Sequence, residues 1–213
     1  MKKITRRGFI GGSLAAAASL TAPAAQGSTR AAGAGAVPTA AAPGAGFSLG
    51  LASYTCREFG LEAALAMARR AGLGRICLKD MHLPLDSSEA TIRATVEKAR
   101  ARGVVPYGCG VVYMTSEAEV DRAFAYARTA GMSVMVGVPE HGLLARAERK
   151  VKETGISLAI HNHGPGDQRY PTPASILERI AAFDPRVGVC LDVGHCRRSG
   201  LDPAAEAGRC GPR

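Results

Sequence analysis

The chain has 213 residues, a formal net charge of +9, no tryptophan and only 5% aromatic residues. Residues 1–45 hold five basic residues and no acidic one, so removing them from the +9 leaves only +4 for the rest. A mildly basic, solvated enzyme surface accounts for that charge, and the shortage of aromatic side chains argues against a surface on which nucleic-acid bases stack. We therefore expect no nucleic-acid partner.

The amino terminus resembles an export signal. Thr5-Arg6-Arg7-Gly8-Phe9-Ile10 resembles the twin-arginine motif, and a weakly apolar stretch and small residues follow it. The stretch is too short and too weakly apolar to form a membrane-spanning helix. We predict a twin-arginine signal peptide over residues 1–26, cleaved near Ala24 or Ala25, with export to the periplasm or another extracytoplasmic space and no stable membrane anchor. The alternative is a disordered basic terminus.

A linker separates this signal from the folded domain. Residues 27–46 are mostly alanine, glycine, proline and threonine, with almost nothing to bury, which is typical of a flexible connection. We assign residues 47–213 to one domain. Its six cysteines show no zinc-ribbon spacing and no C-x-x-C pair, so we expect them to be structural.

From residue 47 onward, one unit repeats along the chain: an apolar run, a polar loop, an amphipathic helix and then glycine. Apolar runs of this length, bounded by glycine and proline, are typical of buried parallel strands. Strand–helix alternation in turn indicates a parallel sheet with right-handed crossovers. We predict six strands, over residues 49–54, 75–78, 104–112, 132–138, 156–161 and 187–192.

The helices between these strands have recognisable start and stop signals. Glycines suited to the left-handed residue after a helix follow four of them: Gly72, Gly103, Gly131 and Gly155. Capping signals or a first-turn proline predict helix starts at Asp86, Ser116, Pro139, Thr172-Pro173 and Asp202-Pro203.

Six βα units can be counted, whereas a closed (β/α)8 barrel needs eight strands and about 250 residues. We therefore predict an α/β fold of the (β/α)8 TIM-barrel type that is incomplete and truncated at its carboxyl end. The alternative is a complete, open six-stranded sheet.

Two predicted strands end in side chains that bind metals or transfer protons. Ile160-His161-Asn162-His163-Gly164 closes the fifth strand, and Leu191-Asp192-Val193-Gly194-His195 closes the sixth. The carboxyl ends of parallel strands are where open sheets and barrels place their chemistry. A single polar strand end is more often a cap, but two together predict a functional site.

Four stretches of the chain form a recognisable set. They are Lys79-Asp80-Met81-His82-Leu83-Pro84, Gly137-Val138-Pro139-Glu140, Ile160-His161-Asn162-His163-Gly164, and Leu191-Asp192-Val193-Gly194-His195 with Arg198 and Gly200. Over residues 47–210 this set resembles the sugar phosphate isomerase/epimerase family, the xylose isomerase-like TIM barrels that also include endonuclease IV. The pattern that ends in His195 is the most specific, because L-D-x-G-H is this family's metal motif.

The resemblance implies a divalent metal, often Mn²⁺, Mg²⁺, Co²⁺ or Zn²⁺, and carbohydrate isomerase or epimerase activity. Asp192 matches the family's ligand from the sixth strand, and His161 falls where many members carry a ligating glutamate. The family's ligands from the seventh and eighth strands have no counterpart in this sequence. In such chemistry a metal holds the carbonyl oxygen of a sugar, and a side chain with a pKa near neutrality moves the neighbouring proton.

Eight residues are the candidates for these roles. For five of them a plainer alternative stays open: Glu140 as a first-turn helix acid, His195 bonded to loop backbone, His163 orienting a ligand, and Lys79 and Arg198 as solvated loop residues. Glu58, Tyr113 and Tyr170 are weaker candidates in predicted loops. We predict metal ligands at His161 and Asp192, catalytic roles for Glu140, His163 and His195, and substrate binding by Lys79, His82 and Arg198.

The leading hypothesis is a metal-dependent sugar or sugar phosphate isomerase or epimerase. The second is a lyase or hydratase of the same fold that acts on 3-keto-glycosides by β-elimination, which His161 in place of glutamate favours. A third, a DNA-repair nuclease, is disfavoured by the export signal and the modest charge. The fourth is an inactive fragment with two bare sheet edges, along which a homo-oligomer could form.

Overall fold

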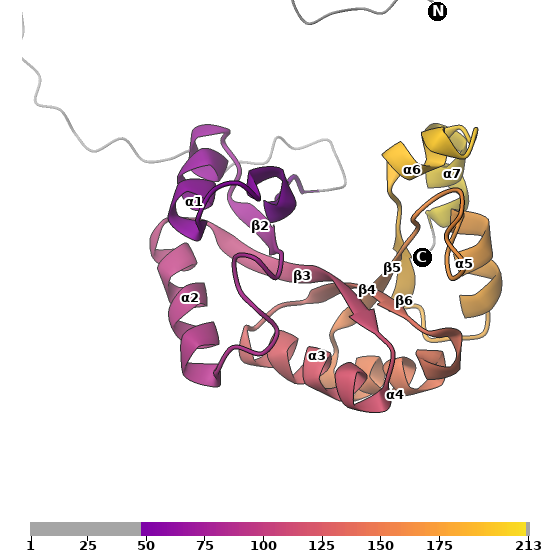
Figure 1. Cartoon of the computed structure of the whole chain (residues 1–213), viewed down its shortest axis with the longest axis horizontal. Coiled ribbons are helices and arrows are strands. Elements are labelled where there is room, and N and C mark those ends of the chain that lie inside the picture. Colours follow the sequence, from indigo (N-terminus) through magenta and orange to yellow (C-terminus); the bar gives the residue numbers. More distant parts are fainter. Residues whose placement is uncertain (1–47, 212–213) are drawn as a thin grey trace, which may run out of the picture. The chain divides into compact units, whose positions relative to one another are not determined.

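The computed structural model describes residues 48–211 (Figure 1). The predicted signal peptide and linker lie outside these residues and stay predictions. The described chain forms one parallel sheet in which each strand is hydrogen-bonded to the next in chain order. Its six strands are β1 (Leu51–Ala52), β2 (Arg75–Leu78), β3 (Val105–Met114), β4 (Val134–Pro139), β5 (Ser157–His161) and β6 (Val187–Cys190).

Helices α1 to α5 run along the outer face of the curved sheet (Figure 1). Among residues 48–211, no helix is long and apolar enough to cross a membrane. The helices are α1 (Leu61–Arg70), α2 (Glu89–Ala101), α3 (Glu117–Thr129), α4 (Leu144–Thr154), α5 (Pro173–Ile180), α6 (Val193–Arg198) and α7 (Pro203–Cys210), with short 3-10 turns η2 (Ser53–Cys56) and η3 (His141–Leu143).

The core lies between the sheet and these helices. Strand β5 shows how the alternation of side chains positions the functional groups: Leu158 and Ile160 are fully buried, whereas Ser157, Ala159 and His161 between and beside them are only partly buried. Because successive side chains point to opposite faces of a strand, His161 projects from the face opposite to the two buried residues. The apolar strand residues thus fix the direction of the histidine.

Much of the predicted pattern is confirmed. Strand β2 has the predicted bounds, and β5 ends at His161 as expected. The four glycines predicted to follow helices all have positive φ, between 63° and 74°. Thr172 and Asp202 cap α5 and α7, each before a proline. The six-stranded parallel sheet confirms the prediction of an incomplete barrel-type fold.

Other boundaries are wrong, and each error has a local cause. Ser88, not Asp86, caps α2, because its hydroxyl accepts the N–H of Thr91. Pro139 ends β4 rather than opening a helix, since the N–H of the next residue, Glu140, donates to Met114 O and continues the pairing with β3.

The first and last strands are also shorter than predicted. Strand β1 gives way at Ser53 to the turn η2, where the Ser53 hydroxyl binds the N–H of Lys79 at 2.8 Å. Strand β6 ends at Cys190, and Asp192 is the residue that caps α6. Both polar side chains bond to loop or helix backbone and so end the strand.

Candidate active site

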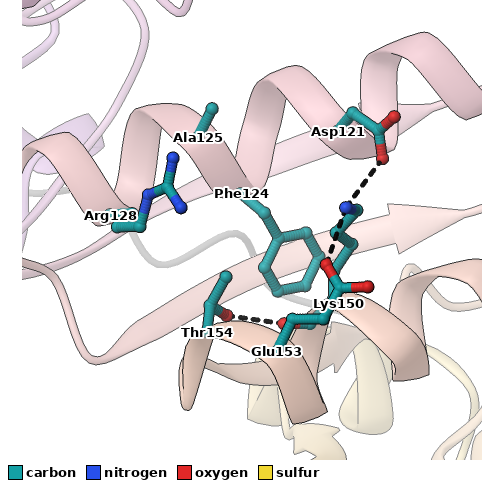
Figure 2. A pocket seen from close by; sticks show the side chains of 7 residues that line it. All are labelled: Asp121, Phe124, Ala125, Arg128, Lys150, Glu153 and Thr154. Carbon is teal, nitrogen blue, oxygen red and sulfur yellow. Dashed lines mark hydrogen bonds and ion pairs between the residues drawn. The ribbon is translucent and has the colours of Figure 1, made fainter.

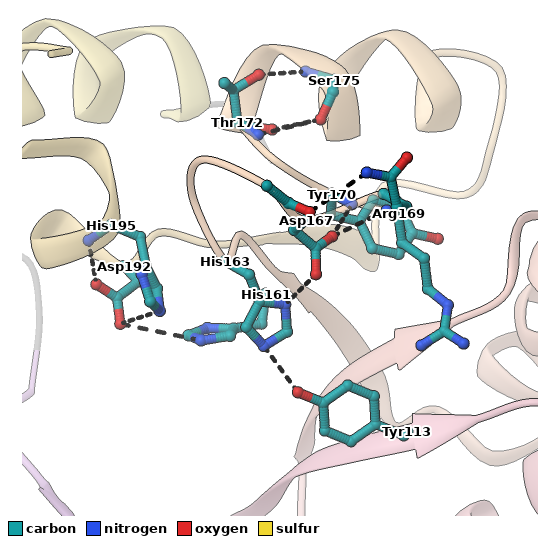
Figure 3. Close-up of polar contacts among 12 residues, drawn as sticks. Tyr113, His161, His163, Asp167, Arg169, Tyr170, Thr172, Ser175, Asp192 and His195 are labelled. Atoms are coloured by element: carbon teal, nitrogen blue, oxygen red, sulfur yellow. Dashed lines mark hydrogen bonds and ion pairs between the residues drawn. The ribbon is translucent and has the colours of Figure 1, made fainter. Parts of the chain in front are cut away.

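Three of the predicted residues converge where β5 and β6 end. The Asp192 carboxylate oxygen Oδ2 lies 3.9 Å from His161 Nε2 and 3.8 Å from His195 Nε2 (Figure 3). One ligand atom from each residue lies within 4.8 Å of the other two. The structure therefore brings together the two predicted metal ligands and adds His195, which we had predicted to be catalytic.

The start of helix α6 orients Asp192. Its Oδ1 accepts the backbone N–H of His195 at 2.8 Å, as an N-cap side chain does, and this leaves Oδ2 facing the two imidazole rings. The fully buried Asn162 holds the same residue from β5: Asn162 Oδ1 accepts the Asp192 N–H at 2.8 Å, and Nδ2 donates to the Asp192 carbonyl at 3.3 Å. The side chain between the two predicted histidines thus fixes the loop that carries Asp192.

This group of three fits a divalent metal ion. Two imidazole nitrogens and one carboxylate oxygen suit Zn²⁺, Co²⁺ or Mn²⁺. The separations of 3.8 and 3.9 Å are somewhat wider than the ~3.4 Å between two ligand atoms of a tetrahedral ion that lies ~2.1 Å from each, so a small inward movement of the side chains would close the group around an ion. Burial, and then the nearby charge of His163, lower the pKa of His161 to about 4, so its imidazole is neutral near pH 7, as a ligand must be.

His163 lies beside this group in a chain of polar contacts. Its ring centroid is 4.7 Å from that of His161. His163 Nε2 is 3.0 Å from the hydroxyl of Tyr113, and Nδ1 is 3.4 Å from Asp167 Oδ2 (Figure 3). Burial is the main cause that lowers the pKa of His163. The Asp167 carboxylate is itself fixed by the N–H groups of Arg169 and Tyr170.

The residues of this series of polar contacts were given too little weight in the sequence analysis. Tyr113 was only a weak loop candidate because the third strand was predicted to stop at Val112; it lies instead within β3 and is 53% exposed. Asp167 was missed, although its place in the loop after His163 is a signal that could have been used. Tyr170, also a weak candidate, is fully buried and donates its hydroxyl to Pro139 O.

Glu140 is not part of the three-residue group. Its Oε1 is paired with Arg169 Nη2 at 3.1 Å, and its side chain is about half exposed. It occupies the position before η3 without making a capping hydrogen bond. The structure thus leaves Glu140 in an ion pair on the β4 loop, and its predicted role as a base or ligand has no geometric support.

The predicted substrate-binding residues have different surroundings. His82 is only 8% exposed: Nε2 donates to the carbonyl of Phe59, and Nδ1 accepts from the Ser53 hydroxyl, both at 2.9 Å. Neither ring nitrogen is left for a substrate, so His82 braces the β1–α1 loop. Lys79 is half-buried, with its ammonium 5.4 Å from the centre of the Tyr54 ring.

Arg198 is tied to the histidines. Its Nη2 donates to the His163 carbonyl at 3.0 Å and also contacts His195 Nδ1. Because a guanidinium only donates hydrogen bonds, this contact makes Nδ1 of His195 an acceptor and places the hydrogen of the neutral ring on Nε2, which faces Asp192. Arg198 would have to release Nδ1 before Nε2 could bind a metal, and its present contacts compete with the predicted binding of a substrate.

A separate small cavity of about 140 Å³ lies between α3 and α4 (Figure 2). Within it Lys150 pairs with Asp121 at 3.6 Å and with Glu153 at 2.8 Å, so its central charges neutralise one another. The group of potential metal ligands lies instead at the strand ends.

No protein-family model and no curated protein matches the chain. Solved structures do. An uncharacterised protein from Parabacteroides distasonis ATCC 8503 superposes with a TM-score of 0.67 and 25% identity, over 79% of this chain and 72% of that one. A sugar phosphate isomerase/epimerase from the same organism superposes with a TM-score of 0.58 and 18% identity, over 83% of this chain and 76% of that one. A xylose isomerase domain protein from Planctomyces limnophilus superposes with a TM-score of 0.54 and 13% identity, over 69% of this chain and 64% of that one.

The chain has the xylose isomerase-like TIM-barrel fold. Six of the eight strands of such a barrel lie within residues 48–211. In this barrel fold, His161, Asp192 and His195 stand at the carboxyl ends of the strands, the end at which TIM-barrel enzymes carry their active sites.

Proposed function

We propose that the protein is a metal-dependent carbohydrate isomerase or epimerase that moves a proton next to a carbonyl group. One observation carries this proposal: His161, Asp192 and His195 form a group that could hold a metal ion, directly beside the contact of His163 with Tyr113. The likeness in fold to a sugar phosphate isomerase/epimerase supports the same class of substrate.

His161, Asp192 and His195 would hold a divalent ion, Mn²⁺, Mg²⁺, Co²⁺ or Zn²⁺. When bound, it supplies a Lewis acid for the carbonyl oxygen of a sugar. Asn162 keeps Asp192 in place through the backbone of that residue.

Tyr113 and His163 would carry the proton. The Tyr113 hydroxyl is exposed enough to reach a substrate, and His163 Nε2 lies 3.0 Å behind it. If His163 accepts a proton at Nε2, the positive charge on its ring is met by Asp167, whose Oδ2 is 3.4 Å from Nδ1. A positioned acid–base pair of this kind typically contributes 10²–10⁴-fold to a rate, by general acid–base catalysis.

Solvent exchange tests the proposal. The full chain, loaded with Mn²⁺, is incubated with ketoses in D₂O, and NMR follows deuterium at the carbon next to the carbonyl. Tyr113→Phe should slow exchange by about 10²-fold or more. Tyr107→Phe, at the other end of the same strand, is the matched control and should exchange like the wild type. No exchange with any ketose or metal would count against an isomerase.

A 3-keto-glycoside lyase or hydratase is the second candidate. It is favoured by His161, a neutral ligand at a place where the family resemblance puts glutamate, because the metal then keeps more of its positive charge. Elimination releases an unsaturated ketone that absorbs ultraviolet light, whereas isomerisation does not. Incubation of the chain with a 3-keto-glycoside therefore separates the two reactions.

We also propose export by the twin-arginine route, with residues 1–26 as the signal and the domain beginning at residue 47. The Arg6-Arg7 pair and the small residues near Ala25 support this. Residues 1–26 fused to a folded reporter should direct it out of the cytoplasm, and replacing both arginines by lysine should stop export.

A further inference from the structure

Two positive groups surround an exposed aromatic ring at the carboxyl ends of β1 and β2. Tyr54, in η2, is 51% exposed. The guanidinium carbon of Arg57 lies 4.9 Å from its ring centre, and Lys79 Nζ lies 5.4 Å from it. Cations this close to an aromatic face are attracted to it, so the ring holds both side chains in place.

Lys79 has no acidic partner of its own. Among residues 48–211 it forms no ion pair, and its backbone N–H is fixed by Ser53. The neighbouring acid, Asp80, accepts the N–H of Leu85. Glu58, which is largely exposed, lies 3.5 Å from Arg57. A half-buried ammonium without a counterion is unfavourable, and an anionic ligand would relieve that cost.

The Lys79 ammonium is electrostatically coupled to the histidines of the candidate site. Its charge is one of the causes, after burial, that lower the pKa of both His161 and His163, which places it within electrostatic reach of the two rings. Lys79 follows β2 and His161 ends β5, so both stand at the carboxyl edge of the same parallel sheet. A ligand at the histidines could therefore extend to Lys79.

We propose that Lys79 and Arg57, held around Tyr54, form a subsite for an anionic substituent of the sugar, either a phosphate or a carboxylate. The inference rests on the proposed function and makes the substrate an anionic ketose rather than a neutral one. Arg198 was also predicted to bind substrate, but its Nη2 is used by His163 and His195. The positive groups left for a substrate are those around Tyr54, after β1 and β2.

Three ketoses test this subsite: fructose, fructose 6-phosphate and fructuronate. Their binding to the full chain is measured by calorimetry, with Mn²⁺ and again in EDTA, because a bound ion attracts anions by itself. The wild type should bind at least one anionic ketose about tenfold or more tightly than fructose. Lys79→Met should remove this preference, Arg57→Met should reduce it, and Lys79→Arg should keep most of it.

Lys98→Met and Arg93→Met are the matched controls, since both residues lie on α2 in ion pairs. A preference confined to fructose 6-phosphate or to fructuronate identifies the anion, and a preference for both means that charge alone is recognised. The subsite is overturned if neither anion binds better than fructose, or if Lys98→Met weakens anion binding as much as Lys79→Met does. Thermal unfolding of each variant shows that it is folded.

Deuterium exchange in the same samples separates the subsite from the proposed function. If neutral and anionic ketoses exchange deuterium at the same rate, the result supports an isomerase and overturns the subsite. An anion preference that is lost in Lys79→Met, without exchange in any ketose, supports the subsite and counts against an isomerase.

Discussion

The two ends of the sheet carry similar residues and use them differently. At the end of β2, Asp80 and His82 are two residues apart; at the end of β6, Asp192 and His195 are three apart. Asp80 and His82 bond entirely to their own and neighbouring loops, through Leu85, Ser53 and Phe59. His195 Nε2 and Asp192 Oδ2, in contrast, face each other at 3.8 Å.

What separates the two regions is the supply of nearby hydrogen-bonding partners. The β1–α1 loop brings a carbonyl and a hydroxyl onto both nitrogens of His82, which makes the histidine a structural brace. At β6, Arg198 takes only Nδ1 of His195, and the other nitrogen is left facing a carboxylate. An incompletely bonded histidine beside an acid is therefore a better sign of a site than the sequence pattern alone.

Asp192→Asn should have the largest effect, because it removes the charge on which the site depends. Asparagine keeps the oxygen that caps α6, so the free energy of unfolding in EDTA should change by less than about 0.5 kcal/mol. The affinity for Mn²⁺, measured by calorimetry, should fall about 100-fold or more. Asp202→Asn makes the same change at the cap of α7 and should leave the affinity unchanged.

Asn162→Leu tests whether the link between β5 and β6 shapes the site. The substitution leaves the N–H and carbonyl of Asp192 without their partner, so the free energy of unfolding should fall by about 2–3 kcal/mol. Affinity for Mn²⁺ should fall about 10- to 100-fold, because the support of a ligand is lost. Denaturant unfolding and metal titration check the two effects, and unchanged values in both would show that Asn162 does not hold Asp192.

His82→Leu and His195→Leu sharpen the comparison as a pair. His82→Leu should lower the free energy of unfolding by about 1–3 kcal/mol, since the buried Ser53 hydroxyl loses the acceptor of its hydrogen and the Phe59 carbonyl loses its donor. The affinity for Mn²⁺ should not change. His195→Leu should lower the affinity for Mn²⁺ and leave the free energy of unfolding nearly unchanged. If His82→Leu weakened metal binding as much as His195→Leu, the two strand ends would not differ as described.

Per pH unit, the pH dependence of stability is a smaller effect. His161 has a pKa of about 4 in the folded chain, against about 6.5 for an unperturbed histidine. Below pH 6.5 the unfolded chain binds a proton that the folded chain does not, so in EDTA the free energy of unfolding should fall as the pH drops from 6.5 to 4, by at most about 1.4 kcal/mol per unit. In His161→Gln this part of the slope should disappear.

The sequence predicted the repeating fold and the meeting of His161 with Asp192, because both depend on local patterns. Apolar runs fix the strands, and parallel strands bring their carboxyl ends to one edge. The glycines after helices were predictable for the same reason, since the left-handed conformation is a property of one residue.

What could not be predicted depends on contacts between distant residues. The partners that seal His82 come from positions 53 and 59, and Tyr113 meets His163 across 50 positions. Strand β4 continues through Pro139 because the N–H of Glu140 donates to the carbonyl of Met114 on the neighbouring strand. Such bonds exist only after the sheet has formed, and no pattern within a single segment records them.

Thermal unfolding of the full chain, first in EDTA and then with saturating Mn²⁺, tests the central claim most directly. A ligand that binds only the folded state raises its stability by about 2.7 kcal/mol at 100 times its dissociation constant. We predict a cooperative transition whose midpoint rises with Mn²⁺ in the wild type and not in Asp192→Asn. A transition indifferent to metal in both would contradict a metal site at His161, Asp192 and His195.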